Sequence, residues 1–467
     1  MPRFGSAVWE SLRTPAGARW RNIALGCLAV GIGAAIWSHA IRSWPHIGYD
    51  FRAYLTGAQL IATGQNPFHA LVSQTGNNGF QAQGYVYPPL LGVLLAAPLR
   101  LGLSHYVVWM LWTLVNVFSV IWMGRELNLA FRGKHDWPMT LVFATASLVP
   151  AVAIYDLYLG QADLLMASLA VGACGLWLRK NPWAGLVLGA AIAIKPIMGL
   201  LLLVWLWKGD WRAALRGALA ATALVALPFG IVGLQAFQDY VTFFIHWNAF
   251  GADAQYINQS PYGMLLRMFT RNPYTHPLEV APWLVMPLRY LSTLVVAGFW
   301  LWVVPRRATA DRALAMGECL LAMPLILLIS PLSEDIHFCL LIPTLFGLSW
   351  LAWDRGLWRG SGGRIGQVSA WALWLTLALF CIPRMQEVIY PEQLFPFPGQ
   401  LSLQFGALVL LFRTGSLLYV SLATLLAGAG VLWAARHAAE QQREPASAEI
   451  ASASDEEPEP AMAVSHQ

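Results

Sequence analysis

Asp50 is the first acidic residue after the first long apolar segment of the chain, which runs from Asn22 to Ile41. A carboxylate at this position would lie where a helix leaves the bilayer. It could be an ordinary solvated group, favoured at the start of a helix by the helix dipole. It could also be a general base at the mouth of a lipid-accessible pocket. Which of the two holds depends on what the rest of the chain places opposite Asp50.

A lysine stands in the middle of an otherwise apolar segment, which is an unusual place for a positive charge. Lys195 is followed by Pro196 within Trp183–Trp207, and an ionisable group there costs about 2.5–3.5 kcal/mol on insertion scales. Such a group is a functional candidate by default. The alternative is a lysine whose side chain reaches back to water.

Two further residues could donate hydrogen bonds to an anion. His337 could do so through either ring nitrogen, and Arg267 could make a bidentate contact. The alternatives are an ordinary loop histidine and an arginine that meets lipid headgroups. Other candidates for the cationic role are Arg52, Arg271 and Arg289. We expect Asp50 to face these positive groups across one outer cavity.

The composition predicts the class of protein that must position these residues. The chain has 467 residues, of which 57% are hydrophobic and 11% charged, whereas soluble domains carry roughly 25% charged residues. Apolar segments of about twenty residues recur along the chain, and each could cross a hydrocarbon core of about 30 Å as a helix. We therefore expect an all-α polytopic membrane protein. The five cysteines and the histidines show no metal-type spacing, so no metal is expected.

Basic residues flank the apolar segments and set the expected topology. Both termini are expected in the cytoplasm of a bacterial inner (plasma) membrane, with no cleaved signal peptide. The segment 183–207 has basic flanks at both ends, so it should form a short hairpin with Lys195 at its tip. The twelve expected spans are about 22–42, 104–123, 138–157, 162–178, the two halves of 183–207, 214–232, 282–304, 313–329, 338–353, 366–382 and 415–435.

Several segments are expected to lie outside the spans. An amphipathic helix over Tyr49–Thr63 and the short apolar piece 90–99 should be interfacial helices in the first outer loop, and 401–413 should be interfacial as well. Residues 233–280 are expected to form a long outer loop, in which Asn258-Gln259-Ser260-Pro261 leads into a helix bearing Arg267 and Arg271. We divide the chain into an integral-membrane domain, 1–436, and a disordered cytoplasmic tail, 437–467, which is rich in Ala, Ser, Glu and Pro.

An ordered set of short motifs resembles glycosyltransferase family 87 of the GT-C superfamily, over about residues 40–350. The motifs are Asp50-Phe51-x-x-Tyr54 with Gly64-x-Asn66-Pro67-Phe68, Tyr87-Pro88-Pro89-Leu90, Gly160-Gln161, Lys195-Pro196, Asn258-Gln259-Ser260 and Ser330-Pro331 followed by His337. The best-known members of that family are mycobacterial mannosyltransferases that use polyprenyl-phosphate-mannose. The chain departs from the usual pattern at Asp163, where Asn is common, and at Glu334-Asp335.

The resemblance implies a GT-C-type helical bundle and a reaction. Asp50 would be the catalytic base of an inverting transfer of a sugar, expected to be mannose, from a polyprenyl phosphate to a periplasmic glycan or glycolipid. Lys195, His337 and Arg267 would bind the donor phosphate. Possible substrate-binding residues are Arg52, Tyr54, Tyr87, Gln161, Asp163, Asn258, Gln259 and Asp335. The lipid-linked sugar is a co-substrate, and neither a cofactor, a metal nor a nucleic acid is expected.

Two readings from other classes stay open. A multi-span transporter or lipid flippase would show broken helices at corresponding positions of two repeats, and only one short hairpin is evident, at 183–207. A scaffold without activity would tolerate the loss of both Asp50 and Lys195.

Overall fold

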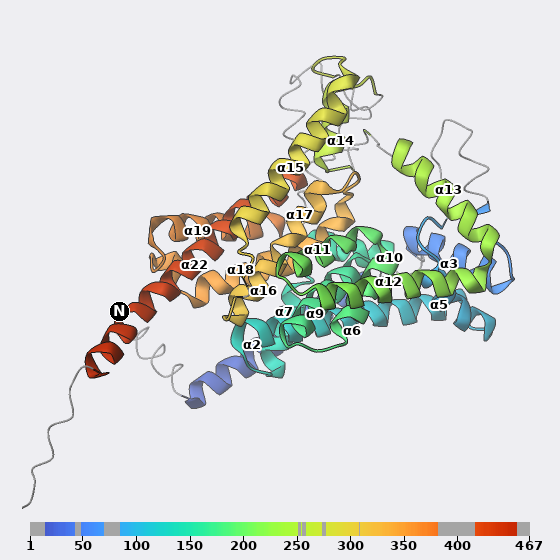
Figure 1. Ribbon diagram of the computed structural model, residues 1–467. Helices are drawn as coiled ribbons and strands as arrows, with labels where there is room; N and C mark the ends of the chain where they lie inside the picture. The colour runs from blue at the N-terminus through green and yellow to red at the C-terminus, as the bar shows by residue number, and fades with distance from the viewer. Residues whose placement is uncertain are drawn as a thin grey trace, which may run out of the picture.

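The computed structural model describes residues 15–42, 48–69, 85–250, 254, 258–272, 277–307, 309–381 and 416–454, and every regular element in these ranges is a helix (Figure 1). The first half contains α2 (Pro15–Arg42), α3 (Tyr49–Ala62), α5 (Leu90–Arg100), α6 (His105–Arg132), α7 (Trp137–Ala146), α8 (Ala151–Leu159), α9 (Asp163–Leu178), α10 (Ala184–Ile194), η1 (Pro196–Gly199), α11 (Leu200–Trp207) and α12 (Trp211–Val232). The second half contains α13 (Leu234–Phe250), α14 (Pro261–Phe269), η2 (Pro282–Leu284), α15 (Val285–Val303), α16 (Arg312–Leu320), α17 (Ala322–Ile329), η3 (Asp335–Leu340), α18 (Leu341–Asp354), η4 (Leu357–Arg359), α19 (Gly363–Phe380) and α22 (Ser416–Ser454).

The helices fit a polytopic membrane protein. Among the described residues, six helices are long and apolar enough to cross a bilayer, or seven if α7 and α8 form one bent span. Shorter apolar helices, including α5, α9 and α10, fill much of the rest. The predicted all-α class is therefore confirmed, whereas the count of twelve spans and the interfacial placement of α3 and α5 stay predictions.

One predicted span has a different form. The segment 138–157 was expected to cross as one helix, but α7 and α8 meet at an angle of 82°. Pro150 precedes α8. Proline lacks a backbone N–H and disfavours helical geometry in the residue before it, so it favours a break in the helix at this point. The bend directs the end of α8 toward α3, with consequences for the site described below.

The hairpin predicted around Lys195 is present as α10, η1 and α11. Lys195 has extended backbone angles, and Pro196 starts η1, so the helix breaks at the predicted position. The segments that flank the hairpin are joined, because Trp177 near the end of α9 donates from Nε1 to Oδ2 of Asp210, the N-cap of α12, at 2.9 Å. On its other face α10 lies close to α12, where a Cβ on Gly189 would come within 2.6 Å of Ala220.

The region after α12 is more helical than expected. The predicted outer loop 233–280 contains α13, which was not expected, and α14, which is the helix expected at Arg267 but ends before Arg271. Helices α14 and α15 rise from one end of the bundle (Figure 1). The last helix, α22, continues to Ser454, so the first part of the predicted tail is helical; its many Ala, Glu and Gln residues are good helix formers. The predicted segments 383–400 and 401–413 lie outside the described residues.

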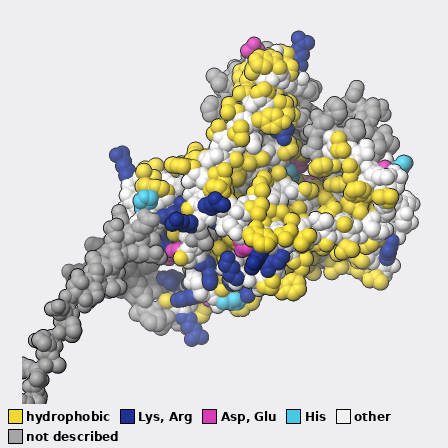
Figure 2. All heavy atoms as spheres, viewed as in Figure 1, with side chains coloured by type: hydrophobic (Ala, Val, Ile, Leu, Met, Phe, Trp, Pro, Cys, Tyr) yellow, Lys and Arg dark blue, Asp and Glu magenta, His cyan; other side chains and the backbone are white. Residues whose placement is uncertain are grey.

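A buried carboxylate ties several segments together at the end of the bundle where the basic flanks gather. Glu318 on α16 is fully buried and accepts hydrogen bonds from Lys208 at 2.5 Å, Arg436 at 2.7 Å and Thr309 at 2.7 Å. Figure 2 shows Lys and Arg side chains in a band across the lower part of one face, below a largely apolar surface. This segregation of charge agrees with the predicted common side of the basic flanks.

Candidate functional site

The tight turn between α8 and α9 is the centre of the candidate site. Gly160 ends α8 with a φ of 74°, and a Cβ there would lie 2.2 Å from the ring of Trp109 and 2.7 Å from Phe51. Only glycine meets both demands. Trp112 donates from its indole N–H to the Gly160 carbonyl at 2.9 Å. The turn is thereby fixed against α6, and the side chain of the next residue, Gln161, has a defined direction.

Gln161 is buried, with 4% of its surface exposed, and lies among tyrosines from two other segments. The hydroxyl of Tyr54 donates to Gln161 Oε1 at 2.7 Å, and the hydroxyl of Tyr87 lies 3.3 Å from the same amide. Burial raises the pKa of both phenols above its usual range, so both keep their protons. Two predicted substrate-binding tyrosines thus meet the predicted Gln161.

Asp50 lies beside this amide because α3 begins against the end of α8. A Cβ on Gly48 would come within 2.3 Å of the Leu159 carbonyl oxygen, and Phe51 packs on the ring of Trp109 at 4.8 Å. Asp50 is half-buried in the first turn of α3. Burial raises the pKa of its carboxyl, while the hydrogen bond with Gln161 and the charge of Lys195 act in the opposite direction.

Lys195 and Asp163 form an ion pair next to these groups. The ammonium Nζ lies 2.6 Å from Asp163 Oδ2, and the two side chains are 10% and 2% exposed. Nζ also lies 5.7 Å from the centre of the Tyr87 ring. Asp156 caps α9 instead of facing the lysine, because its carboxylate accepts the backbone N–H groups of Asp163 and Leu164 at 3.1 and 3.4 Å.

His337 joins this group from the far end of the chain. Its Nδ1 accepts the backbone N–H of Glu334 at 3.2 Å, so in the neutral ring the proton is on Nε2. Lys195, Asp163 and His337 line one cavity of about 40 Å³ together with Ser330 and Ser333. The structure therefore brings two of the three predicted phosphate ligands together, and the charge of one of them, Lys195, acts on Asp50.

The Asn258-Gln259-Ser260 motif and Arg267 occupy a neighbouring loop junction. Asn258 donates from Nδ2 to the Pro331 carbonyl at 3.2 Å and accepts the Ser333 backbone N–H at 3.2 Å. Arg267 donates from Nη1 to the Asn258 carbonyl at 2.8 Å. These bonds hold the loop against the Ser330–Ser333 segment. Among the residues that line the 40 Å³ cavity, Arg267 is absent, so its contact with phosphate stays a prediction.

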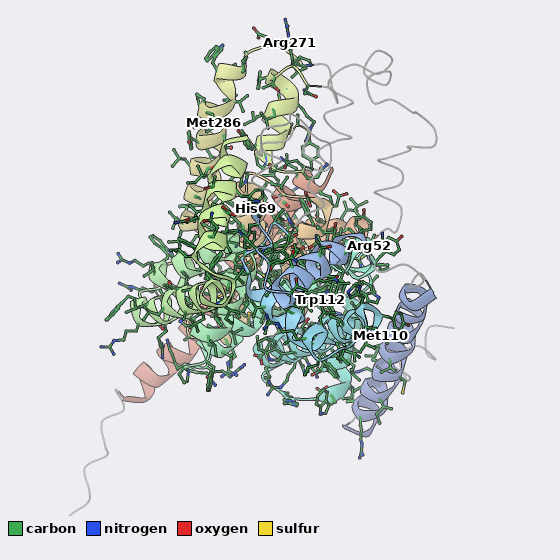
Figure 3. The ribbon with its side chains drawn as sticks, turned by 90° about the vertical axis from the view of Figure 1, so that its right-hand side faces the viewer. Arg52, His69, Met110, Trp112, Arg271 and Met286 are labelled. Carbon is green, nitrogen blue, oxygen red and sulfur yellow. The ribbon has the colours of Figure 1, made fainter. Side chains whose placement is uncertain are left out.

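The remaining predicted residues lie around the edge. Arg52 points outward from α3 and is exposed, and Arg271 lies far from it, beyond the end of α14 (Figure 3). Asp335 begins η3 with a side chain that is 9% exposed. Gln259 is buried, and its backbone N–H donates to the Ser333 carbonyl at 2.8 Å. A direct substrate contact by any of these four remains a prediction.

The family of the chain follows from its similarity to known proteins. The sequence profile described as glycosyltransferase family 87 matches residues 85–331, which is more than half of the chain. The chain belongs to glycosyltransferase family 87. The matched range includes Tyr87, Gln161, Asp163 and Lys195, whereas Asp50 precedes it.

The curated relatives of this family 87 protein have related printed names. A protein of Mycobacterium tuberculosis named polyprenol-phosphate-mannose-dependent alpha-(1-2)-phosphatidylinositol mannoside mannosyltransferase is 26% identical, over 73% of this chain and 79% of its own. A protein of the same name from Mycolicibacterium smegmatis is 26% identical over 65% and 68%. Another M. smegmatis protein, named for the pentamannoside, is 22% identical over 81% and 86%. No solved structure matches significantly.

Sequence reasoning missed an apolar groove beside the family 87 site. The groove has a volume of about 630 Å³ and lies between α10, α12 and α13, where it is lined by Ile192, Ala221, Thr222, Val225, Ala226, Phe229, Gly230, Leu234 and Phe237. It depends on α13, which the sequence analysis took for loop. The only available signal was the mixture of aromatic and polar residues in 234–250.

The Asn66-Pro67-Phe68 motif has a structural role next to this groove. Asn66 donates to Asp239 on α13 at 2.7 Å, and the ring of Phe68 lies 6.0 Å from Phe229, a groove residue. Phe68 also lies 5.9 Å from Tyr85, which adjoins Tyr54. A series of neighbouring aromatic rings therefore runs from the groove to the polar site.

Metal ligands are not grouped in the part of the chain that the structure describes. Within it, no three His, Cys, Asp or Glu side chains come together as a metal site requires. Independence from metal and cofactor stays a prediction for this family 87 protein.

Proposed function

We propose that this family 87 glycosyltransferase is an inverting mannosyltransferase of the bacterial inner membrane, which takes mannose from a polyprenyl phosphate. The observation that carries the proposal is that Lys195 and His337 line one cavity with Asp163 of the α8–α9 turn, and that the charge of Lys195 acts on Asp50. The printed names of the relatives supply the sugar and the class of donor. The acceptor is a glycan or glycolipid on the periplasmic side, by analogy with their phosphatidylinositol mannosides.

The chemistry follows from the positions of these groups. Asp50 takes the proton of the acceptor hydroxyl as its oxygen attacks the anomeric carbon of mannose. The bond from that carbon to the phosphate oxygen breaks, and the phosphate leaves with the bonding electrons, so the anomeric configuration inverts. A general base of this kind contributes about 10²–10⁴ in rate.

The departing phosphate needs hydrogen-bond donors. The Lys195 ammonium has three donor positions and uses one for Asp163, and His337 can donate from Nε2. Charge-assisted hydrogen bonds contribute about 1.5–3 kcal/mol each. Both side chains face the same cavity, which supports their assignment to the donor phosphate.

The apolar groove supports a lipid-linked donor. Ile192 lies on the groove one helical turn before Lys195 on α10, so a phosphate at the lysine would have its hydrocarbon chain next to apolar side chains. We assign the groove between α10, α12 and α13 to the prenyl chain. Its burial is favourable by about 0.8 kcal/mol per methylene group.

Transfer of labelled mannose by the protein in proteoliposomes tests the proposal. Asp50→Asn keeps the size of the side chain and removes the base, so kcat should fall about 10²–10⁴-fold with little change in donor affinity. Asp354→Asn is the control, since that side chain is 53% exposed at the opposite end of α18. Full turnover by Asp50→Asn would reject Asp50 as the base. Movement of the lipid without cleavage of the sugar–phosphate bond would favour a transporter.

A further inference from the structure

The outer wall of the apolar groove is formed by the first turn of α13. Leu234 and Phe237 line the groove, yet they are 71% and 43% exposed. A hydrocarbon chain that lies in the groove would therefore pack directly on both side chains. The position of α13 thus decides how much of such a chain the protein contacts.

The direction of α13 is not set by the helix before it. Gly233 alone separates α12, which ends at Val232, from α13, which begins at Leu234. Its φ of 107° is a positive value that glycine adopts readily and a helix does not contain, so α13 does not continue α12. Contacts further along α13 must therefore hold its first turn against the groove.

Asp239 makes such a contact two residues after Phe237. Its Oδ2 accepts a hydrogen bond from Nδ2 of Asn66 at 2.7 Å, and Asn66 Oδ1 accepts the backbone N–H of Phe68 at 2.9 Å. A backbone N–H only donates and a carboxylate only accepts, so both ends of the amide are assigned by their partners. Asp239 is 9% exposed, and a carboxylate so buried is costly without a donor.

The ring of Phe68 packs on both helices that meet at Gly233. It lies 5.1 Å from the ring of Tyr240 on α13 and 6.0 Å from the ring of Phe229 on α12. The turn that follows α3 therefore joins the two walls of the groove.

Asp239 has two further neighbours, and neither replaces Asn66. Gln235 donates to Oδ1 at 2.9 Å, but it lies on α13 itself and moves with it. His69 has a side chain that is 81% exposed, and its Nδ1 lies 3.7 Å from Oδ2, which is beyond hydrogen-bond distance. The polar link from Asp239 to the turn after α3 is therefore made by the Asn66 amide.

We propose that Asn66 and Asp239 determine the specificity for the donor: their hydrogen bond holds α13 against the groove, so that Leu234 and Phe237 pack on the prenyl chain. Both are positioning residues, because they act through the wall and do not touch the reacting atoms. The inference rests on the proposed function, since it requires a lipid-linked donor. It gives the Asn66-Pro67-Phe68 motif a role in selecting that donor.

The reciprocal exchange of the two side chains is the test. Asn66→Asp keeps an oxygen for the Phe68 backbone N–H but places a second carboxylate against Asp239. The KM for a long-chain polyprenyl-phosphate-mannose should rise about tenfold, which corresponds to lost contact with roughly two methylene groups, and kcat should not change. Asn66→Asp combined with Asp239→Asn restores one donor and one acceptor, so the KM should return to the wild-type value.

Hydrogen exchange of the α13 backbone gives a measurement that does not depend on transfer. A long-chain polyprenyl phosphate should slow exchange in α13 of the wild type, because a chain in the groove stabilises the wall. The protection should be smaller in Asn66→Asp and should return in the double variant. Methyl phosphate, which has no chain, should give none.

Asn181→Asp is the matched control. Asn181 also accepts a backbone N–H two residues ahead, that of Trp183 at 2.9 Å, but it precedes α10 and does not line the groove. Both the KM and the exchange of α13 should stay at wild-type values. The inference is overturned if Asn66→Asp keeps the wild-type KM and protection, or if it lowers kcat at an unchanged KM.

The wild type separates this inference from the proposed function. Transfer of mannose from the polyprenyl donor, with no protection of α13 by polyprenyl phosphate, would reject the role of α13 and leave the proposed function in place. Absence of both transfer and protection would reject the two together.

Discussion

Lys195 and Asp163 form a buried ion pair in which Nζ lies 2.6 Å from Oδ2. The pair explains how a lysine is kept charged inside an apolar segment, because a buried charge needs a partner. It also means that the site carries a neutralised cation before the donor arrives. The donor phosphate would then share the ammonium with Asp163 rather than neutralise it alone.

The first prediction concerns this pair. Asp163→Asn leaves the lysine buried without its counter-charge, so the free energy of unfolding should fall by about 3–5 kcal/mol. A lipid-linked mannose donor would restore part of the loss, because its phosphate replaces the missing charge. Thermal unfolding with and without donor should show a larger stabilisation by donor in the variant than in the wild type. Equal stabilisation of both proteins by the donor would contradict a contact between Lys195 and the donor phosphate.

The second prediction is a pH dependence of stability. Burial raises the pKa of Asp50 in the folded protein, so the folded state holds this proton more tightly than the unfolded chain does. The stability that Asp50 contributes is present below pH ~4 and is lost as the pH rises through the raised pKa. Asp50→Asn should therefore be more stable than the wild type at neutral pH. Between pH 4 and pH 8, the unfolding midpoint of the variant should rise increasingly above that of the wild type. A less stable variant at pH 7 would contradict the prediction.

The third prediction tests the groove. Ala226→Trp should fill part of the space between α12 and α13 and displace roughly two methylene groups of a prenyl chain, which raises KM about tenfold. A donor with a shortened chain should be unaffected. Leu227→Trp is the control, since that neighbour is 68% exposed and does not line the groove. An equal effect of both variants on both donors would place the chain elsewhere.

The fourth prediction concerns the contact between α3 and α8. A methyl group at Gly48 would lie 2.3 Å from the Leu159 carbonyl oxygen, so Gly48→Ala must separate the two helices. We expect a loss of about 1–3 kcal/mol in stability, and a drop in kcat because Asp50 moves from Gln161. Gly298→Ala on α15 adds its methyl to open space and should change neither quantity. Unaltered transfer by the Gly48 variant would show that activity does not require the close approach of α3 to α8.

The sequence predicted the hairpin and the convergence on it for a physical reason. Basic flanks on both sides of 183–207 require two crossings, and proline after Lys195 supplies the break. Asp50 and His337 could be placed on the same side by counting charged flanks. The hairpin follows from the distribution of charge and one proline, and the roles of Asp50, Lys195 and His337 follow from the family resemblance, so neither inference needed tertiary information.

The 82° bend could have been expected from Pro150, but 138–157 is long enough and sufficiently apolar to be taken for one span. Other features depend on contacts that no local pattern carries. Gln161 is buried against Tyr54, which is more than a hundred positions away in the sequence. The helix α13 mixes aromatic and polar residues, so it was taken for loop. For these two, the packing partner rather than the segment itself determines the structure.

The three bonds to Glu318 have a consequence for how the chain matures. Lys208 and Thr309 are synthesised before or soon before this carboxylate, but Arg436 follows more than a hundred residues later on α22. The nascent protein therefore carries this buried carboxylate with Lys208 as its only basic partner among these three until its last helix inserts. A polypeptide truncated ahead of α22 would already contain the proposed catalytic residues. It would lack the bond from Arg436 to Glu318 that joins α22 to α16, so we expect it to be less stable than the full chain.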